Sequence, residues 1–322
     1  EVIEKKMVAI EPGYEGIPPG ILRRMGKAIR MSVGAAMPIL KNNENLNGII
    51  IGTANGGMED CIKFLNQIVQ YEEGLLAPGN FVQSTNNAIA AQLGLLSNNK
   101  FYNITHVHRG LAFENALLDA IMQTKQFPGK NYLLGGADEI SSFNYNIENL
   151  AGAYKKEEVS NFELYRSESP GSIAGEAAAM FLVNDKKENA VAGLQGLQIL
   201  HTANEQLVKE QLQQFIKSNL PGSEKIDLLL SGENGDNRTL KFYTTCESML
   251  NGDSAIARFK HLCGEFPTAS AFGLWLTCHI LKTQKLPLHM FKKGSLKNSY
   301  RNILLYNNFK GYQHSFILLK GF

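Results

Sequence analysis

The segment from Phe101 to Asp119, FYNITHVHRGLAFENALLD, constrains the fold more strongly than any other stretch. Aromatic and β-branched residues at 101–105 favour a buried strand, and apolar residues between 111 and 121 recur at helical spacing. A sharp turn between the two places one side chain at the head of the helix, beside free N–H groups and the positive end of the helix dipole. Many enzymes hold a serine or cysteine nucleophile at such an elbow. This chain has Val107 there, between His106 and His108.

The composition excludes several classes of protein. The 322 residues are 44% hydrophobic and 19% charged, so the chain can bury a large core and is not disordered. A net charge of +2 is too balanced for a dedicated nucleic-acid binder, and no apolar run is long enough to span a membrane. The cysteines have neither zinc-site nor disulfide-framework spacing, which predicts four reduced thiols in a cytoplasmic protein: Cys61, Cys246, Cys263 and Cys278.

The beginning of the chain is unusual. The first residue is Glu1 rather than methionine, and no signal peptide is visible. We expect that the N-terminal strand of the fold precedes the first residue of this sequence.

Apolar strands and helices alternate along the chain, which predicts an α/β fold with buried sheets. In the first half we expect a helix over 21–37 that ends by Pro38, an extended segment over 76–85, surface loops over 150–168, and strands over 47–53, 131–134 and 175–183. In the second half we expect helices over 203–218, 239–250 and 269–283, and strands over 226–231, 302–306 and 315–319.

The second half repeats the first in part. The segments NGIIIGTANGG and IDLLLSGENGD both read as a strand, a glycine loop and the start of a helix. A charged turn at 185–189 separates the halves, so we divide the chain into 1–186 and 187–322. The duplication predicts two βαβ halves packed together. The first glycine loop lacks the GxGxxG spacing and the lysine of nucleotide-binding loops, and we expect no cofactor.

Seven motifs in order resemble the β-ketoacyl synthases, a family with the thiolase-like fold. GIIIGTANGG resembles the family's first-strand motif, and FVQSTNNAIAAQLG resembles the segment before its nucleophile. THVHRG lies where the family has TACxxG, and LLGGADE and GEAA resemble its LAGGxE and GEGAG. IDLLLSGEN and KHLCGE lie over its IDxxNAHGT and KSxxGH. The resemblance implies a layered α-β-α-β-α sandwich of two duplicated halves.

An active ketosynthase of this family needs a cysteine nucleophile and two histidines. Position by position, the cysteine falls on Val107, the first histidine on Gly232 to within one residue, and the second on Glu265. The family lysine is kept as Lys260, and the family's GFGG loop is replaced by KGYQ at 310–313. All three catalytic residues are therefore replaced.

This pattern resembles a chain-length factor, a cysteine-less subunit that pairs with a catalytic ketosynthase and works with an acyl carrier protein. The segments around the elbow resemble bacterial members linked to aryl-polyene and flexirubin-like pigments. Two alternatives stay open. One is an active synthase or malonyl decarboxylase with a rearranged site that uses His108 or Glu265. The other is a self-associating protein that binds an acyl chain.

The remaining candidate residues have structural as well as functional interpretations. His106, His108 and Arg109 are expected to make structural or interface contacts more often than to act as a base or an anion site, since a general base without a nucleophile does little. Phe113 is expected in the core, where in this family it can also border the acyl tunnel. Two further expectations are that Glu176 holds internal hydrogen bonds and that Cys263 is a buried structural thiol. Lys260 and Glu265 are candidates for an ion pair.

Overall fold

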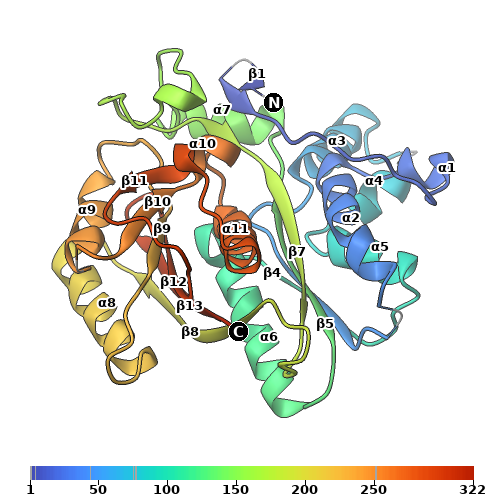
Figure 1. Cartoon of the computed structure of the whole chain (residues 1–322). Coiled ribbons are helices and arrows are strands. Elements are labelled where there is room, and N and C mark those ends of the chain that lie inside the picture. Colours follow the sequence, from blue (N-terminus) through green and yellow to red (C-terminus); the bar gives the residue numbers. More distant parts are fainter. Residues whose placement is uncertain (1, 4, 44, 75, 77, 251) are drawn as a thin grey trace.

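A computed structural model of the protein describes residues 2–3, 5–43, 45–74, 76, 78–250 and 252–322. Its elements stack in five layers, helix, sheet, helix, sheet, helix (Figure 1). The middle layer holds α6 (Ala112–Gln126) and α11 (Ala269–Thr283), whose apolar residues pack between both sheets in one core. The predicted layered α/β sandwich is confirmed.

Two sheets form the second and fourth layers. The first sheet has the order β4-β3-β5-β7, with strands Tyr102–His106, Gly48–Gly52, Tyr132–Asp138 and Ala177–Val183. The second has the order β11-β10-β9-β12-β13-β8, with strands Phe291–Lys293, Ala255–Arg258, Leu228–Ser231, Asn302–Phe309, Gln313–Gly321 and Ala192–His201. Short strands β1 (Val2–Ile3), β2 (Lys6–Met7) and β6 (Ala174–Gly175) form a third, small sheet.

The two main sheets repeat one design, as the sequence predicts. In the first, β3 is parallel to β4 and β5, and β7 is antiparallel to β5. In the second, β9 is parallel to β10 and β12, and β13 is antiparallel to β12. The second sheet has an extra strand at each edge, since β11 pairs with β10 and β8 pairs with β13. The corresponding edge of β7 has no partner among the strands that the structure describes.

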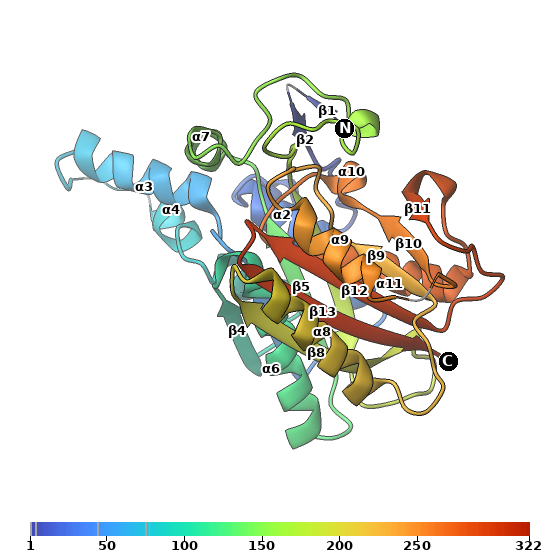
Figure 2. The ribbon, with the colours of Figure 1, turned by 90° about the vertical axis from the view of Figure 1, so that its left-hand side faces the viewer.

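Helices cover the outer faces of both sheets. Helices α2 (Lys27–Leu40) and α5 (Ala88–Leu96) pack on the first sheet, and α8 (Glu205–Asn219) and α9 (Leu240–Ser248) pack on the second. Short helices connect these layers: α1 (Pro19–Leu22), α7 (Ser142–Leu150), α10 (Lys260–Cys263), η1 (Arg109–Leu111), η2 (Asn161–Glu163) and η3 (Leu288–Met290). Helices α3 (Met58–Gln70) and α4 (Pro78–Gln83) project from the body as an arm (Figure 2).

Two predicted elements of the first half are wrong. The segment predicted as extended over 76–85 contains helix α4, which begins at Pro78, where the absent N–H costs nothing in a first helical turn. The helix predicted over 21–37 is split into α1 and α2, and α2 continues through Pro38 to Leu40. Pro38 removes one N–H···O=C bond, to Gly34, and because it lies in the last turn the loss falls at the end of the helix. Helix α7 and strands β8 and β10 were not predicted from the sequence.

Other predictions from composition are consistent with the structure. All four cysteines are free thiols. Among the described residues, no helix combines the length and the apolar character needed to cross a membrane. Glu176 is buried and holds the fold together, since it accepts hydrogen bonds from the N–H groups of Ala9 at 2.9 Å and Ile140 at 2.7 Å and pairs with Lys27 at 2.6 Å.

Candidate functional site

The elbow between β4 and α6 has the predicted strand-turn-helix shape without a nucleophile. Val107 occupies its tip and is 46% exposed. Arg109 adopts a left-handed backbone conformation with φ of +48°, which makes the turn sharp. The N–H of Gly110 donates to Oε1 of Gln313 at 2.9 Å. This N–H is therefore occupied by a side chain of the altered 310–313 loop.

Both histidines of the elbow are held by residues of α6. Nε2 of His106 lies 2.9 Å from Oδ2 of Asp119, and Nδ1 of His108 lies 2.8 Å from Nδ2 of Asn115. Arg109 is exposed and makes no ion pair with any described residue. These contacts agree with a structural role for the two histidines.

A buried ion pair lies at the position that the family resemblance assigns to the second histidine. Nζ of Lys260, which is fully buried, lies 2.7 Å from Oε1 of Glu265. The other oxygen, Oε2, accepts a hydrogen bond from Nδ2 of Asn234 at 2.7 Å. Both carboxylate oxygens of Glu265 are therefore engaged, one by the Lys260 ammonium and one by the Asn234 amide.

A neighbouring strand packs against Gly232, the position that the family resemblance assigns to the first histidine. The N–H of Gly232 donates to the carbonyl of Tyr306 at 2.8 Å. A Cβ added to Gly232 would lie 2.4 Å from Oδ1 of Asn307, closer than real Cβ atoms approach. The backbone at this position therefore has no room for a histidine while Asn307 keeps its conformation.

A cavity of about 490 Å³ lies beside the ion pair. Asn234 and Glu265 line it together with apolar side chains: Ile140, Phe242, Phe266, Pro267, Phe309 and Tyr312. Among the described residues that line it, none belongs to the elbow. Phe309 separates the two, because it lines the cavity and also packs against Gly110, where an added Cβ would lie 2.3 Å from the Phe309 Cβ. The predicted site residues thus lie in two separate places, with Val107 at the tip of the elbow and Glu265 beside the cavity.

Phe113 lies outside this cavity. It is fully buried in the central layer, and its ring centroid lies 5.9 Å from that of Phe181. The predicted core role of Phe113 is confirmed.

Cys263 is also buried, as predicted. Burial raises its pKa to about 12, so it remains a neutral thiol.

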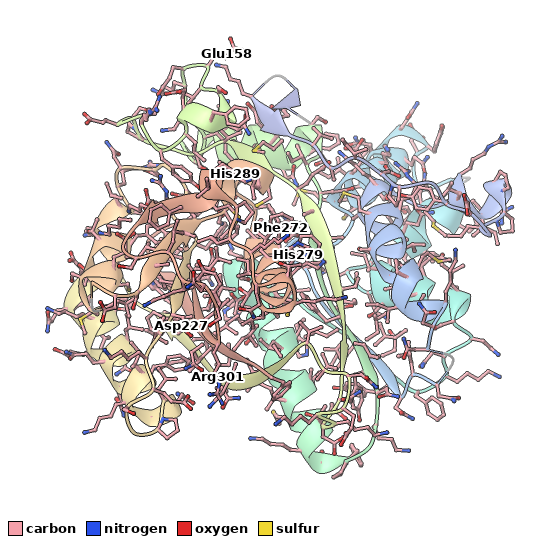
Figure 3. The ribbon with its side chains drawn as sticks, in the orientation of Figure 1. Glu158, Asp227, Phe272, His279, His289 and Arg301 are labelled. Atoms are coloured by element: carbon pink, nitrogen blue, oxygen red, sulfur yellow. The ribbon has the colours of Figure 1, made fainter. Side chains whose placement is uncertain are left out.

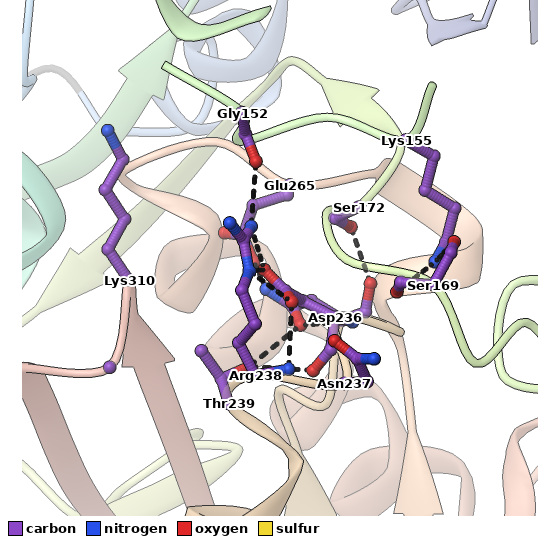
Figure 4. A network of polar contacts seen from close by, with 12 residues as sticks. Gly152, Lys155, Ser169, Ser172, Asp236, Asn237, Arg238, Thr239, Glu265 and Lys310 are labelled. Carbon is purple, nitrogen blue, oxygen red and sulfur yellow. Dashed lines mark hydrogen bonds and ion pairs between the residues drawn. The ribbon is translucent and has the colours of Figure 1, made fainter. Parts of the chain in front are cut away.

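Charged residues surround the cavity in two ion pairs. Lys310, from the turn between β12 and β13, pairs with Glu148 of α7. Arg238 pairs with Asp236 at 2.6 Å and donates to the carbonyl of Gly152 at 2.8 Å (Figure 4). Lys310 has φ of +55°, a conformation that favours glycine, and it stands where the family resemblance implies a glycine.

The polar network continues behind these pairs (Figure 4). Lys155 is 5% exposed and its Nζ donates to the carbonyl and hydroxyl of Ser169 and to the carbonyl of Gly235, each at 3.0 Å. Burial lowers the pKa of Lys155. Four cavity residues were not predicted from the sequence, because their roles depend on contacts with segments far away in the chain: Asn234, Asp236, Arg238 and Phe309. The signals in the sequence were that Asn234 lies in the motif IDLLLSGEN and that Phe309 precedes the altered 310–313 loop.

Two buried carboxylates hold the loops near the cavity. Asp138 accepts hydrogen bonds from Thr53 and Ala54 of the first glycine loop and from Thr268 at the start of α11. Glu139, a cavity residue, accepts from the N–H groups of Ala28 in α2 at 2.9 Å and Glu59 in α3 at 3.4 Å. Burial raises the pKa of Asp138 to about 6 and that of Glu139 to about 7.

Within the described part of the chain, no group of three or more His, Cys, Asp or Glu side chains is placed to hold a metal ion.

Comparisons with known proteins agree with this architecture. Residues 5–148 match the family model "Beta-ketoacyl synthase, N-terminal domain". No curated protein matches the sequence. The chain therefore resembles the β-ketoacyl synthases, with the N-terminal domain of that family in its first half.

Solved structures with this fold cover both halves. One is the ketosynthase ApeO in complex with its chain length factor ApeC from Xenorhabdus doucetiae, with a TM-score of 0.77, 14% identity, and 98% of this chain and 86% of that one covered. Another is the ishigamide ketosynthase/chain length factor, with a TM-score of 0.75, 15% identity, and coverage of 98% and 91%. A third is AntDE:AntF, a type II polyketide synthase carrier protein in complex with its ketosynthase, with a TM-score of 0.76, 13% identity, and coverage of 94% and 87%.

Proposed function

We propose that this protein is a non-catalytic ketosynthase-like subunit, a chain-length factor, that pairs with a catalytic ketosynthase during carrier-bound chain elongation in the cytoplasm. The resemblance around the elbow favours an aryl-polyene or flexirubin-type pathway over other polyketide or fatty-acid pathways.

One observation carries the proposal: the elbow lacks a nucleophile and is separated from the cavity, while the scaffold around it is kept. Val107 cannot carry an acyl group, Gln313 occupies the Gly110 N–H, and Phe309 separates the elbow from the cavity. The engaged carboxylate of Glu265 also speaks against a rearranged synthase that uses it as a base. A retained fold without its chemistry is what a partner subunit requires.

The partner surface that we propose is the open edge of the first sheet. Strand β4 is an edge strand, so its outer N–H and C=O groups can pair with another strand. Phe101 before it is 67% exposed, and on the adjacent helix α6 the side chains of Leu118 and Met122 are 41% and 59% exposed. An unpaired edge beside exposed apolar side chains is typical of an interface. A subunit with the same fold would present the same edge in return.

The solved structures of similar fold support this assignment by the subunits that they contain. Two of them are a ketosynthase with its chain length factor, and the third is a carrier protein in complex with its ketosynthase. We extend both kinds of partner to this chain: a catalytic ketosynthase at the β4 edge, and an acyl carrier protein. A homodimer through the same edge is the second candidate, because the surface is equally available to a second copy.

The test measures condensation of acyl and malonyl carrier thioesters by the purified protein alone, by a cysteine-containing ketosynthase from the same gene neighbourhood alone, and by the two together. We expect no turnover by this protein alone and a large gain when both are present. Turnover by this protein alone would refute the proposal. A stable homodimer that does not exchange with the ketosynthase would favour the second candidate.

Interface variants make the test specific. Leu118→Glu and Met122→Glu place charges beside β4 without disturbing buried groups, and we expect them to abolish co-purification with the ketosynthase. The matched control is Leu207→Glu on α8, which is 38% exposed and belongs to the outer layer of the other half. Equal complex formation by all three variants would contradict the proposed surface.

A further inference from the structure

Two histidines from distant segments face one another outside the cavity. His261 lies on α10 and is 3% exposed, and His289 lies in η3 on the surface, near α10 (Figure 3). Nε2 of His261 is 3.0 Å from Nδ1 of His289, and the ring planes are inclined by 75°. The pair joins segments that are 28 residues apart, and neither ring has a part in the function proposed above.

The surroundings orient the buried ring. The hydroxyl of Tyr165 lies 3.2 Å from Nδ1 of His261 and accepts the backbone N–H of the same residue at 3.1 Å. Asn161 donates from Nδ2 to the His261 carbonyl at 3.0 Å. The guanidinium of Arg258 stacks 3.8 Å from the centre of the Tyr165 ring, which holds the tyrosine in place. We assign the proton of His261 to Nδ1, facing the hydroxyl oxygen of Tyr165, which leaves the electron pair of Nε2 directed at His289.

The geometry points to a two-histidine site for a divalent transition metal of the zinc and copper class, which we propose is formed by His261 Nε2 and His289 Nδ1. Two nitrogens bound at about 2.0–2.1 Å to one ion, at roughly 90–109° to each other, are roughly 2.9–3.4 Å apart. The observed separation of 3.0 Å falls in this range. A small rotation of the exposed His289 ring directs both electron pairs at one point. Water completes the coordination sphere, because these two rings are the protein ligands.

The contact from Tyr165 to Nδ1 has the form of an outer-shell partner, which fixes the orientation of a ligating histidine and raises its basicity. A bound ion would join η3 to α10. Lys260, the residue before His261, is the buried cation that holds Glu265. Metal binding is therefore expected to stabilise the segment that supports the cavity ion pair.

Titration of the full chain, without a polyhistidine tag, with ZnCl₂ in an isothermal calorimeter tests the site. We expect one ion per chain and a thermal unfolding temperature that rises with zinc concentration. His289→Gln, a surface change, should weaken binding at least about tenfold, since even outer-shell changes cost that much. His279→Gln is the matched control, because His279 is exposed on α11 and stacks only on Trp275 (Figure 3). It should bind as the unaltered chain does.

Electron paramagnetic resonance of the Cu²⁺ complex gives a second readout that does not depend on stability. Two imidazole nitrogens should split the copper signal, and one should remain in His289→Gln. Copper should bind more tightly than zinc. The proposal is overturned by the absence of saturable zinc binding, by equal affinity in His289→Gln and the unaltered chain, or by a copper signal without two nitrogen ligands. None of these outcomes bears on the chain-length-factor assignment.

Discussion

Removing one charge of the Lys260–Glu265 ion pair should destabilise the fold, whereas removing both charges should cost little. In Lys260→Met, the side chain at a fully buried position loses its charge but keeps its length, and Glu265 retains only the hydrogen bond from Asn234. Leaving one partner of a buried pair uncompensated costs about 3–5 kcal/mol. Because Glu265 is 8% exposed and borders a cavity that water can enter, we expect the lower limit, about 3 kcal/mol.

Thermal unfolding measures this loss. An unfolding entropy of about 2.1 cal/mol/K per residue gives roughly 0.7 kcal/mol/K for this chain, so about 3 kcal/mol lowers the melting temperature by about 4 °C. The double variant Lys260→Met/Glu265→Gln should recover to within about 1 kcal/mol, since it removes both charges at similar volume. The reasoning is refuted if Lys260→Met melts at the temperature of the unaltered chain, or if the double variant is no more stable than Lys260→Met.

Three further predictions concern the replaced site and its supports. Val107→Cys should react readily with a maleimide because its position is half exposed, yet show no acyl transfer from a carrier thioester, because Phe309 separates the elbow from the cavity; an acylated protein in the mass spectrum would contradict this. Gly232→His should lower the melting temperature, and adding Asn307→Ser should restore part of the loss; equal melting of both variants would show that the clash is absent. For Glu139, the folded pKa of about 7 lies above the usual value, so its protonated form is favoured in the fold, and its stabilising contribution declines as pH rises from about 4.5 to 7. As pH rises over this range, the melting temperature of Glu139→Gln should therefore rise relative to that of the unaltered chain. A difference that does not change with pH would contradict the raised pKa of Glu139.

Strong local patterns in the sequence were enough to predict the central strands and helices of the fold. The apolar runs that became β3, β9 and α11 are long and bounded by glycine loops or polar turns, so their periodicity predicted them well. The extended segment over 76–85 failed because its few apolar residues carry no clear period, and α4 depends on packing against α3, where Phe64 and Phe81 are in ring contact.

For the site, motif order assigns Val107, Gly232 and Glu265 to the catalytic positions of the family, and this assignment stays a prediction. The same motifs suggested the Lys260–Glu265 ion pair, which the structure contains. The separation of the elbow from the cavity depends on Phe309, which belongs to a strand about 200 residues further along the chain than the elbow. No local pattern predicts contacts across such a separation. The contact between His261 and His289, which are 28 residues apart, was not predicted because it too depends on how separate segments pack.

The packing at Gly232 has an evolutionary consequence. Asn307 stands within van der Waals distance of that backbone, so a mutation that brings histidine back meets an obstacle that a separate mutation must first remove. Neither step alone offers a selectable benefit. For the partner-subunit role that we propose, a return to catalysis is therefore more than one step away, and descendants of such a lineage are free to specialise in assembly.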